Sequence, residues 1–252
     1  MIKKQKLSCS VVIPNFNDKE SLINFVTEVF GVFESKPQFD FEIIVVDDGS
    51  TDGSVEVLLE KFSSNQNLSI IQLYRNFGQQ LALKVGLSFA RLENVITIDG
   101  DGQTPAEIIP EFVQRIQDGY DMVSGVRQNR NEGFFDVFSS KIGGKIIQRI
   151  FSCNISDFGS AKCFSSSLKE KILNTNFGAP DVYAAALYWN PSLSEIKIAH
   201  RQRKIGVSKW SLSMRLKLFF DLYMKYKPTD FGVFSFAGIF QVFVGVMLFV
   251  VW

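Results

Sequence analysis

Two carboxylates separated by one residue follow a short apolar stretch near the middle of the chain. Residues 94–105 read NVITIDGDGQTP, so Asp99 and Asp101 come directly after a run of β-branched residues. Such a run predicts a buried strand, and a buried strand that ends in two carboxylates and two glycines is poorly suited to a core. In open α/β folds, ligands bind at the carboxyl ends of strands, where these oxygens can hold a hard divalent cation. The glycines let the backbone or a ligand approach closely.

The same segment begins like a calcium-binding loop. Counted from Asp99, such a loop requires Gly at its sixth position and Glu at its twelfth, where this chain has Thr104 and Pro110. The calcium-loop interpretation therefore fails. A site for Mg²⁺ or Mn²⁺ remains, beside the alternative that the two aspartates belong to an ordinary surface loop.

Predicted strands and helices alternate in the segments that must position these carboxylates. Helical spacing of apolar residues follows each of the first four predicted strands, which indicates an α/β fold with a mostly parallel sheet. No GxGxxG follows the first strand and no GxxxxGK[ST] occurs, which counts against dinucleotide-binding and P-loop folds. The predicted strands cover residues 10–14, 41–46, 68–73, 95–98 and 122–125.

A second acidic turn follows the predicted strand at residues 41–46. Asp47 and Asp48 begin the sequence DDGSTDG, again at the end of a strand, so their carboxylates are expected to face a ligand. The alternative is turn and cap chemistry, with residues 50–52 capping the next helix.

Composition excludes several classes of protein. The net charge of +1 gives no global field that would attract nucleic acid. Three scattered cysteines without CxxC spacing predict buried free thiols in a reducing compartment. The N-terminus has no long apolar segment before Pro14, so it is not a signal peptide.

The C-terminal residues 232–252 contain no charged residue. As a helix they would extend roughly 31 Å, the thickness of a hydrocarbon core, so we expect a membrane span and take a buried core helix as the alternative. Lysines precede this segment, which predicts that the N-terminal domain faces the cytoplasm. The amphipathic stretches 134–151 and 211–226 are either packed on the domain or lie at the membrane interface.

Several motifs together resemble the family 2 glycosyltransferases of the GT-A fold. SVVIPNFND resembles the first strand and loop of that family, VVDDGSTDGS its nucleotide-binding turn, and IDGDGQTPAEIIP its metal motif. Within the family, RNFGQQLALKVG, SDFGSAKCFSSS and HRQRKIGVSKW resemble polyprenyl-phosphate glycosyltransferases of the dolichyl-phosphate mannose synthase type. The same motifs resemble in particular those of bacterial undecaprenyl-phosphate sugar transferases. The resemblance covers nearly the whole chain.

The resemblance implies an enzyme that transfers a sugar from a nucleotide-sugar donor, with a UDP-sugar favoured, to a polyprenyl (undecaprenyl) phosphate. It implies inversion at the sugar, dependence on Mg²⁺ or Mn²⁺, and a product used to modify cell-envelope glycans such as lipopolysaccharide. The residues implied for the metal are Asp99, Asp101 and Gln103, and those for the donor are Pro14, Asn17, Asp47, Asp48, Asp99 and Gln103.

The acceptor phosphate would be bound by basic residues, and Asp157 matches the proposed base position of the family. A phosphate monoester has a second pKa of about 6, so its oxygen is already largely deprotonated at neutral pH. We therefore expect Asp157 to orient acceptor-binding groups more than to abstract a proton. The implied acceptor ligands are Arg127, Arg130, Arg203 and Lys209, and the implied catalytic residues are Asp101 and Asp157.

These expectations divide the chain into a cytoplasmic catalytic domain (1–208), a juxtamembrane amphipathic helix (209–230) and a transmembrane helix (231–252), the last being the first of two if the chain is a fragment. The expected location is the inner membrane, and the expected partners are the nucleotide-sugar donor, the polyprenyl phosphate and the bilayer. The sequence does not decide whether the protein also forms a homo-oligomer. Two other functions compete: a processive polysaccharide synthase, which normally shows QxxRW and several spans, and an inactive nucleotide-sugar-binding membrane scaffold.

Overall fold

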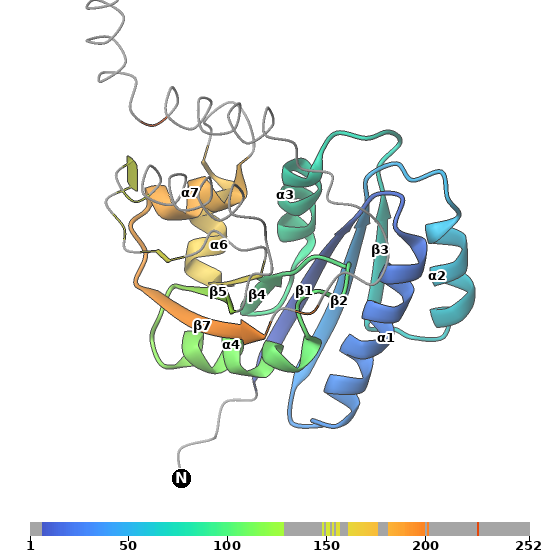
Figure 1. The fold of residues 1–252 in the computed structure, drawn as a ribbon, viewed down its shortest axis with the longest axis horizontal. Coiled ribbons are helices and arrows are strands. Elements are labelled where there is room, and N and C mark those ends of the chain that lie inside the picture. The colour runs from blue at the N-terminus through green and yellow to red at the C-terminus, as the bar shows by residue number, and fades with distance from the viewer. Residues whose placement is uncertain are drawn as a thin grey trace, which may run out of the picture.

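The computed structural model describes residues 7–128, 148, 150, 151, 153, 155, 156, 161–175, 181–199, 201 and 226. Within these residues a seven-stranded sheet lies between two layers of helices (Figure 1). The strands are β1 (Ser8–Asn15), β2 (Asp40–Asp47), β3 (Leu68–Gln72), β4 (Asn94–Thr97), β5 (Met122–Gln128), β6 (Lys162–Ser165) and β7 (Leu193–Ala199). The helices are α1 (Lys19–Glu34), α2 (Ser54–Phe62), α3 (Gln79–Phe89), the 3-10 helix η1 (Ala106–Ile108), α4 (Ile109–Gln117), α6 (Ser166–Leu173) and α7 (Val182–Tyr188).

The strand order is β3-β2-β1-β4-β6-β5-β7. β1 pairs in parallel with both β2 and β4, and β5 pairs in parallel with β7. β6 is antiparallel to its neighbours β4 and β5. The predicted α/β fold with a mostly parallel sheet is therefore confirmed.

Both faces of the central strand β1 are buried, as expected for a parallel strand covered on each side. Successive side chains point to opposite faces, so Val11 and Ile13 pack with α1 and α4, whereas Val12 packs with α3 on the opposite face. Helices α6 and α7 belong to the second face (Figure 1).

Phenylalanines fill the space between α1, α2 and β2. Phe33 of α1 stacks on Phe41 of β2 with ring centroids 4.2 Å apart, and Phe30 stacks on Phe62 of α2 at 5.2 Å. These ring pairs stabilise the packing of α1 on α2 and β2, since aromatic pairs contribute beyond the area that they bury.

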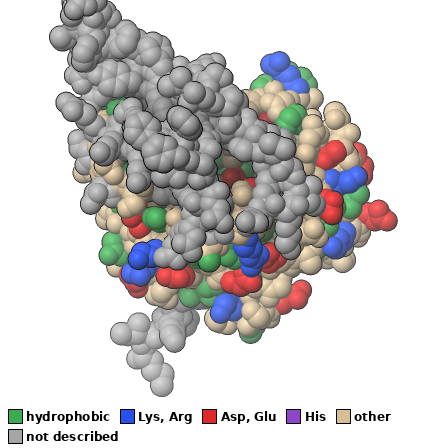
Figure 2. All heavy atoms as spheres, in the orientation of Figure 1, with side chains coloured by type: hydrophobic (Ala, Val, Ile, Leu, Met, Phe, Trp, Pro, Cys, Tyr) green, Lys and Arg blue, Asp and Glu red, His purple; other side chains and the backbone are tan. Residues whose placement is uncertain are grey.

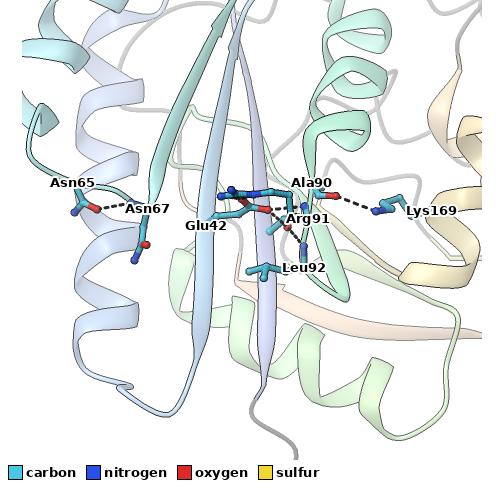
Figure 3. Close-up of polar contacts among 8 residues, drawn as sticks. Glu42, Asn65, Asn67, Ala90, Arg91, Leu92 and Lys169 are labelled. Carbon is cyan, nitrogen blue, oxygen red and sulfur yellow. Dashed lines mark hydrogen bonds and ion pairs between the residues drawn. The ribbon is translucent and has the colours of Figure 1, made fainter.

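A network of hydrogen bonds links residues at the amino ends of β1 and β2 to the segment that precedes β4 (Figure 3). The buried carboxylate of Glu42 accepts from the Ser10 hydroxyl at 2.7 Å and from the Arg91 side chain at 2.8 Å. The hydroxyl of Ser10 in turn accepts from the backbone N–H of Leu92. These bonds hold Arg91 and Leu92, which lead into β4, against Ser10 of β1 and Glu42 of β2.

The N-terminus of α2 differs from the prediction. Its N-cap is Gly53, in the left-handed region with φ 78°, and no side chain caps it. Asp52 still binds this end of the helix, because its carboxylate accepts from the backbone N–H of Ser54, the first residue of α2, and from that of Lys19, the first residue of α1. The acidic turn thus binds the first residues of both helices.

Several expectations fall wholly or partly outside the described residues. These are the stretch 134–151, apart from three helical residues near its end, and the segments 209–230 and 231–252, apart from Tyr226. Where the chain is described, no helix is both long and apolar enough to cross a membrane. The three cysteines are free thiols, and Cys9 and Cys163 are buried as predicted.

Candidate functional site

The strand order creates a switch point between β1 and β4. From β1 the chain moves outward to β2 and β3, and then returns to the other side of β1 to form β4. Ligands of open α/β sheets bind outside the carboxyl ends of the strands at such a point. Asn15 ends β1 and Thr97 ends β4, so the loop at Asn17 and the Asp99–Asp101 loop both follow the carboxyl ends of the two strands at this switch point.

The loop after β4 keeps its two carboxylates partly accessible. Ile98 continues the pairing, because its N–H donates to the carbonyl of Val12. Asp99 and Asp101 are half-buried. Oδ1 of Asp99 accepts from the side-chain amide of Gln79 at 2.7 Å, and Oδ1 of Asp101 accepts from the backbone N–H of Gln103 at 3.0 Å.

Gly100 separates these carboxylates for a steric reason. A Cβ at this position would lie 3.0 Å from Cγ2 of Ile13 and 3.2 Å from Cδ1 of Leu22. The expectation of a close backbone approach is thus confirmed on the core side of the loop. Gly102 serves the backbone differently, because its φ of 69° lies in the region that favours glycine.

The first aspartate of the turn after β2 holds together the loops at the carboxyl ends of β1 and β2. Asp47 is fully buried; its carboxylate accepts from the side-chain amide of Asn15 at 2.8 Å and from the backbone N–H of Ser50 at 2.9 Å. A carboxylate that accepts two such bonds holds the loops after β1 and β2 in one arrangement.

The second aspartate joins this turn to the loop that begins α3. The two oxygens of Asp48 accept from the backbone N–H groups of Phe77 and Gly78, at 2.7 and 2.8 Å. Gly49 lies directly against the same loop, because a Cβ there would be 2.5 Å from the carbonyl carbon of Arg75. The turn therefore has the structural role that was the alternative to ligand binding, and contact of Asp47 or Asp48 with a nucleoside stays a prediction.

Asn17 is exposed and adopts a positive φ of 49°. Its backbone N–H donates to the hydroxyl of Ser50 at 2.9 Å, and its side-chain oxygen accepts from Thr51 at 2.8 Å. Pro14 is half-buried in β1, opposite Val46. The predicted donor residues therefore all lie at the carboxyl ends of the neighbouring strands β1, β2 and β4.

The predicted acceptor residues are described only in part. Arg127 lies near the carboxyl end of β5, half-buried and paired in register with Ile198 of β7. The other three predicted acceptor residues and one of the two predicted catalytic residues lie outside the described residues, as does the single histidine, His200. They are Arg130, Asp157, Arg203 and Lys209.

Three residues near Asp99 were not predicted from the sequence. Gln79 begins α3 and donates to Asp99, as described above. Tyr183 of α7 lies with its hydroxyl 3.4 Å from that of Thr97, and burial, followed by the negative charge of Asp99, raises the pKa of its phenol. Lys162 of β6 is fully buried with Nζ 4.1 Å from the centre of the Tyr183 ring. The sequence signal that could have identified Lys162 is a lysine beside the apolar residues of a short strand.

The loop after β4 suits a divalent ion that binds together with its substrate. Among the described residues no group of three or more His, Cys, Asp or Glu could hold a metal by itself. Mg²⁺ is usually held by one or two carboxylates with substrate phosphates and waters completing the shell. Asp99 and Asp101 supply two hard oxygen donors of this kind, so the residues fit the predicted ion.

The described face in Figure 2 carries interspersed acidic and basic side chains, in keeping with the small net charge.

The model of the family described as glycosyl transferase family 2 matches residues 10–170, more than half of the chain. The chain therefore belongs to this family, whose enzymes are nucleotide-sugar-dependent glycosyltransferases, and its sheet is that of a GT-A fold. The matched residues include the Asp47–Asp48 turn and the Asp99–Asp101 loop.

Solved structures share the fold at low sequence identity. The mannosyltransferase PcManGT from Pyrobaculum calidifontis, in complex with GDP-Man and Mn²⁺, has a TM-score of 0.58 at 20% identity over 79% of this chain and 58% of its own. Glucosyl-3-phosphoglycerate synthase from Mycobacterium tuberculosis, in complex with Mn²⁺, UDP and phosphoglyceric acid, has a TM-score of 0.63 at 16% identity. The match covers 87% of this chain and 78% of the synthase. TarS 1-349 from S. aureus, in complex with UDP-GlcNAc, has a TM-score of 0.56 at 20% identity. The match covers 87% of this chain and 67% of TarS. This chain thus spans little more than half the length of the mannosyltransferase.

Proposed function

We propose that the chain transfers a sugar from a nucleotide sugar, with a UDP-sugar favoured, to a polyprenyl phosphate at the cytoplasmic face of the inner membrane. The observation that carries the donor half is the meeting of the loops after β1, β2 and β4 at the switch point of the sheet, with Asp99 and Asp101 half-buried. The acceptor half rests on the sequence motifs SDFG and RKIGVSK and on the apolar residues 232–252.

Metal dependence is part of the proposal. Mn²⁺ accompanies GDP-Man in the mannosyltransferase and UDP in the phosphoglycerate enzyme, in agreement with the Mg²⁺ or Mn²⁺ predicted from the sequence. Asp99, Asp101 and Gln103 would hold the ion, with Asp101 as the principal ligand. Bound there, a divalent ion offsets the negative charge that develops on the leaving diphosphate.

The residues of the chain then bind and orient the two substrates. The Asp47–Asp48 turn, together with Pro14 and Asn17, shapes the nucleoside pocket at the carboxyl ends of β1 and β2. A buried Asp47 that already holds Asn15 and Ser50 favours a preorganised pocket, in which binding does not have to order the loops.

On the acceptor side, Arg127, Arg130, Arg203 and Lys209 would hold the phosphate of the lipid, the arginines through paired hydrogen bonds. Asp157 would orient these groups so that a phosphate oxygen attacks the anomeric carbon from the face opposite the leaving diphosphate. One carbon–oxygen bond forms as another breaks, which inverts the configuration. Orientation of this kind can supply a large part of the rate enhancement.

The test is to incubate membranes containing the full chain with a panel of labelled nucleotide sugars and undecaprenyl phosphate, with and without Mn²⁺. We expect label to pass into organic solvent with one donor and only when Mn²⁺ is present. The matched control is Asp101→Asn, which keeps the size of the side chain and removes its charge. Polymeric product would favour a processive synthase. No lipid-linked product with any donor would refute the proposal, and retained donor binding without transfer would favour a scaffold.

A further inference from the structure

An arginine outside the predicted site holds the far end of the metal loop, defined here as residues 99–106. Two guanidinium nitrogens of Arg201 donate hydrogen bonds to carboxylates. Nη1 donates to the two oxygens of Glu28 at 2.9 and 3.0 Å, and Nη2 donates to Oε2 of Glu107 at 3.2 Å. Arg201 follows β7, Glu28 belongs to α1 and Glu107 to η1. One guanidinium therefore joins three parts of the chain that are far apart in sequence.

The same residues bind the backbone of the metal loop. The backbone N–H of Arg201 donates to the carbonyl of Gln103 at 2.9 Å. The N–H of Ala106 donates to Oε1 of Glu28 at 2.8 Å, so this oxygen is shared between the loop and the guanidinium. The loop from Asp101 to Ala106 is thereby anchored at Gln103 by the backbone and at Ala106 through a carboxylate that Arg201 orients.

Charge explains why an arginine is needed between these groups. Glu28 and Glu107 both contact one guanidinium, so they are like charges brought near each other, and removal of Arg201 leaves their repulsion unbalanced. Glu28 would then turn toward water and lose its bond to Ala106. A lysine in place of Arg201 would retain the positive charge, although it could not reproduce the planar, paired contact.

Exposure indicates where this cluster acts. The Arg201 and Glu28 side chains are 41% and 26% exposed, and such pairs contribute little to global stability. Loops at binding sites, however, open with much smaller free energies than the whole fold. A contact that is small on the global scale can therefore decide the conformation of the loop that carries Asp101 and Gln103.

We propose that Arg201 is a positioning residue, which holds the metal loop in the conformation that presents Asp101 and Gln103 to the donor and its metal. The inference rests on the proposed function. It also assigns a role to the first basic residue of the segment that continues to Arg203, two residues further along the chain.

The first test uses hydrogen–deuterium exchange on the metal-free full chain. In Arg201→Ala we expect the amide of Ala106 to exchange about tenfold faster, corresponding to about 1.4 kcal/mol. Arg201→Lys should give an intermediate rate. The matched control is Arg91→Ala, which removes an Arg–Glu pair of the described residues at the opposite end of the sheet, on Glu42, and should leave exchange in the metal loop unchanged. Unchanged exchange in Arg201→Ala would refute the inference.

The second test measures transfer against Mn²⁺ concentration for the same variants. Arg201→Ala should raise the Mn²⁺ concentration for half-maximal rate about tenfold, with less change in the rate at saturation, and Arg91→Ala should not change it. An equal effect in both variants would mean that Arg201 acts only on overall stability. If the unmodified chain transfers no sugar, the proposed function fails, while the exchange experiment still decides whether Arg201 holds the loop.

Discussion

Substitution of Gly49 by alanine would show how strongly the turn after β2 determines the donor site. A Cβ there would lie 2.5 and 2.6 Å from the carbonyl carbon and Cα of Arg75 and 2.9 Å from the backbone nitrogen of Asn76. These are backbone atoms, so no side-chain rotation can relieve the contact. The loop that would have to move also supplies the Phe77 and Gly78 N–H groups that Asp48 accepts.

Gly53→Ala provides a matched control for this substitution. Gly49 and Gly53 have nearly the same φ, 74° and 78°, and a Cβ on Gly53 would meet only Oε2 of Glu56 at 3.8 Å. Both variants pay about 1–2 kcal/mol for a left-handed alanine and share the effect of alanine on the unfolded chain. The difference between them therefore isolates the contact with the Arg75 backbone.

Overpacking of this kind costs about 1–3 kcal/mol. For a chain of this size, 1 kcal/mol lowers the unfolding temperature by about 2–4 °C, so Gly49→Ala should unfold about 2–12 °C below Gly53→Ala. Thermal unfolding followed by circular dichroism measures the difference, and donor titration should show a higher KM for Gly49→Ala alone. If both variants unfold at the same temperature, the close approach of the two loops does not limit stability and the reasoning fails.

Three further predictions concern pH and the two halves of the site. Burial would raise the pKa of Glu42, but hydrogen bonds, first from the Arg91 backbone, outweigh burial and lower it below the ordinary 4.5. Glu42 therefore stabilises the fold above pH 4.5 and loses this effect as the pH falls through the lower folded-state pKa, so Glu42→Gln should flatten the acid-unfolding curve there. Gln79→Leu removes the 2.7 Å bond to Asp99; hydrogen bonds to charged groups contribute about 1.5–3 kcal/mol, so kcat/KM should fall at least about tenfold in a donor-saturation assay. Asp157→Asn should lose activity at all pH values if the residue orients the acceptor, whereas full recovery in alkaline buffer would show it to be a base.

The sequence predicted the parallel part of the sheet well because its signals are local. Each of the first five strands contains a short group of mostly apolar, β-branched residues, which can be recognised within a few positions of the chain. β6 escaped detection because it is short and contains the buried Lys162. β7 could have been found, since Ile196 and Ile198 are buried and Lys197 between them is exposed. Its period of two is weak because only a few residues alternate.

The candidate site was predictable as residue types and not as contacts. Acidic turns at strand ends predicted a ligand site at the carboxyl ends of the strands, and the structure places both turns at those ends. The partners of those turns are distant in sequence: Asp48 binds N–H groups about thirty residues away, and Arg201 binds Glu28 across 173 positions. Such pairs depend on how the loops pack after the sheet forms, and no local pattern of residues reports them.

Exposure separates four aspartates of the two acidic turns, Asp47, Asp48, Asp99 and Asp101, into two roles. Asp47 and Asp48 are almost completely buried, at 0% and 3%, and their oxygens accept backbone and amide N–H groups of neighbouring loops. Asp99 and Asp101 are half-buried at the switch point, where an incoming cation can reach a carboxylate without breaking the fold. Loss of charge at the buried pair should therefore lower stability and donor binding together, whereas Asp101→Asn should abolish transfer and leave the unfolding temperature nearly unchanged. Rigid buried carboxylates behind accessible ones are what preorganised binding of a charged donor requires.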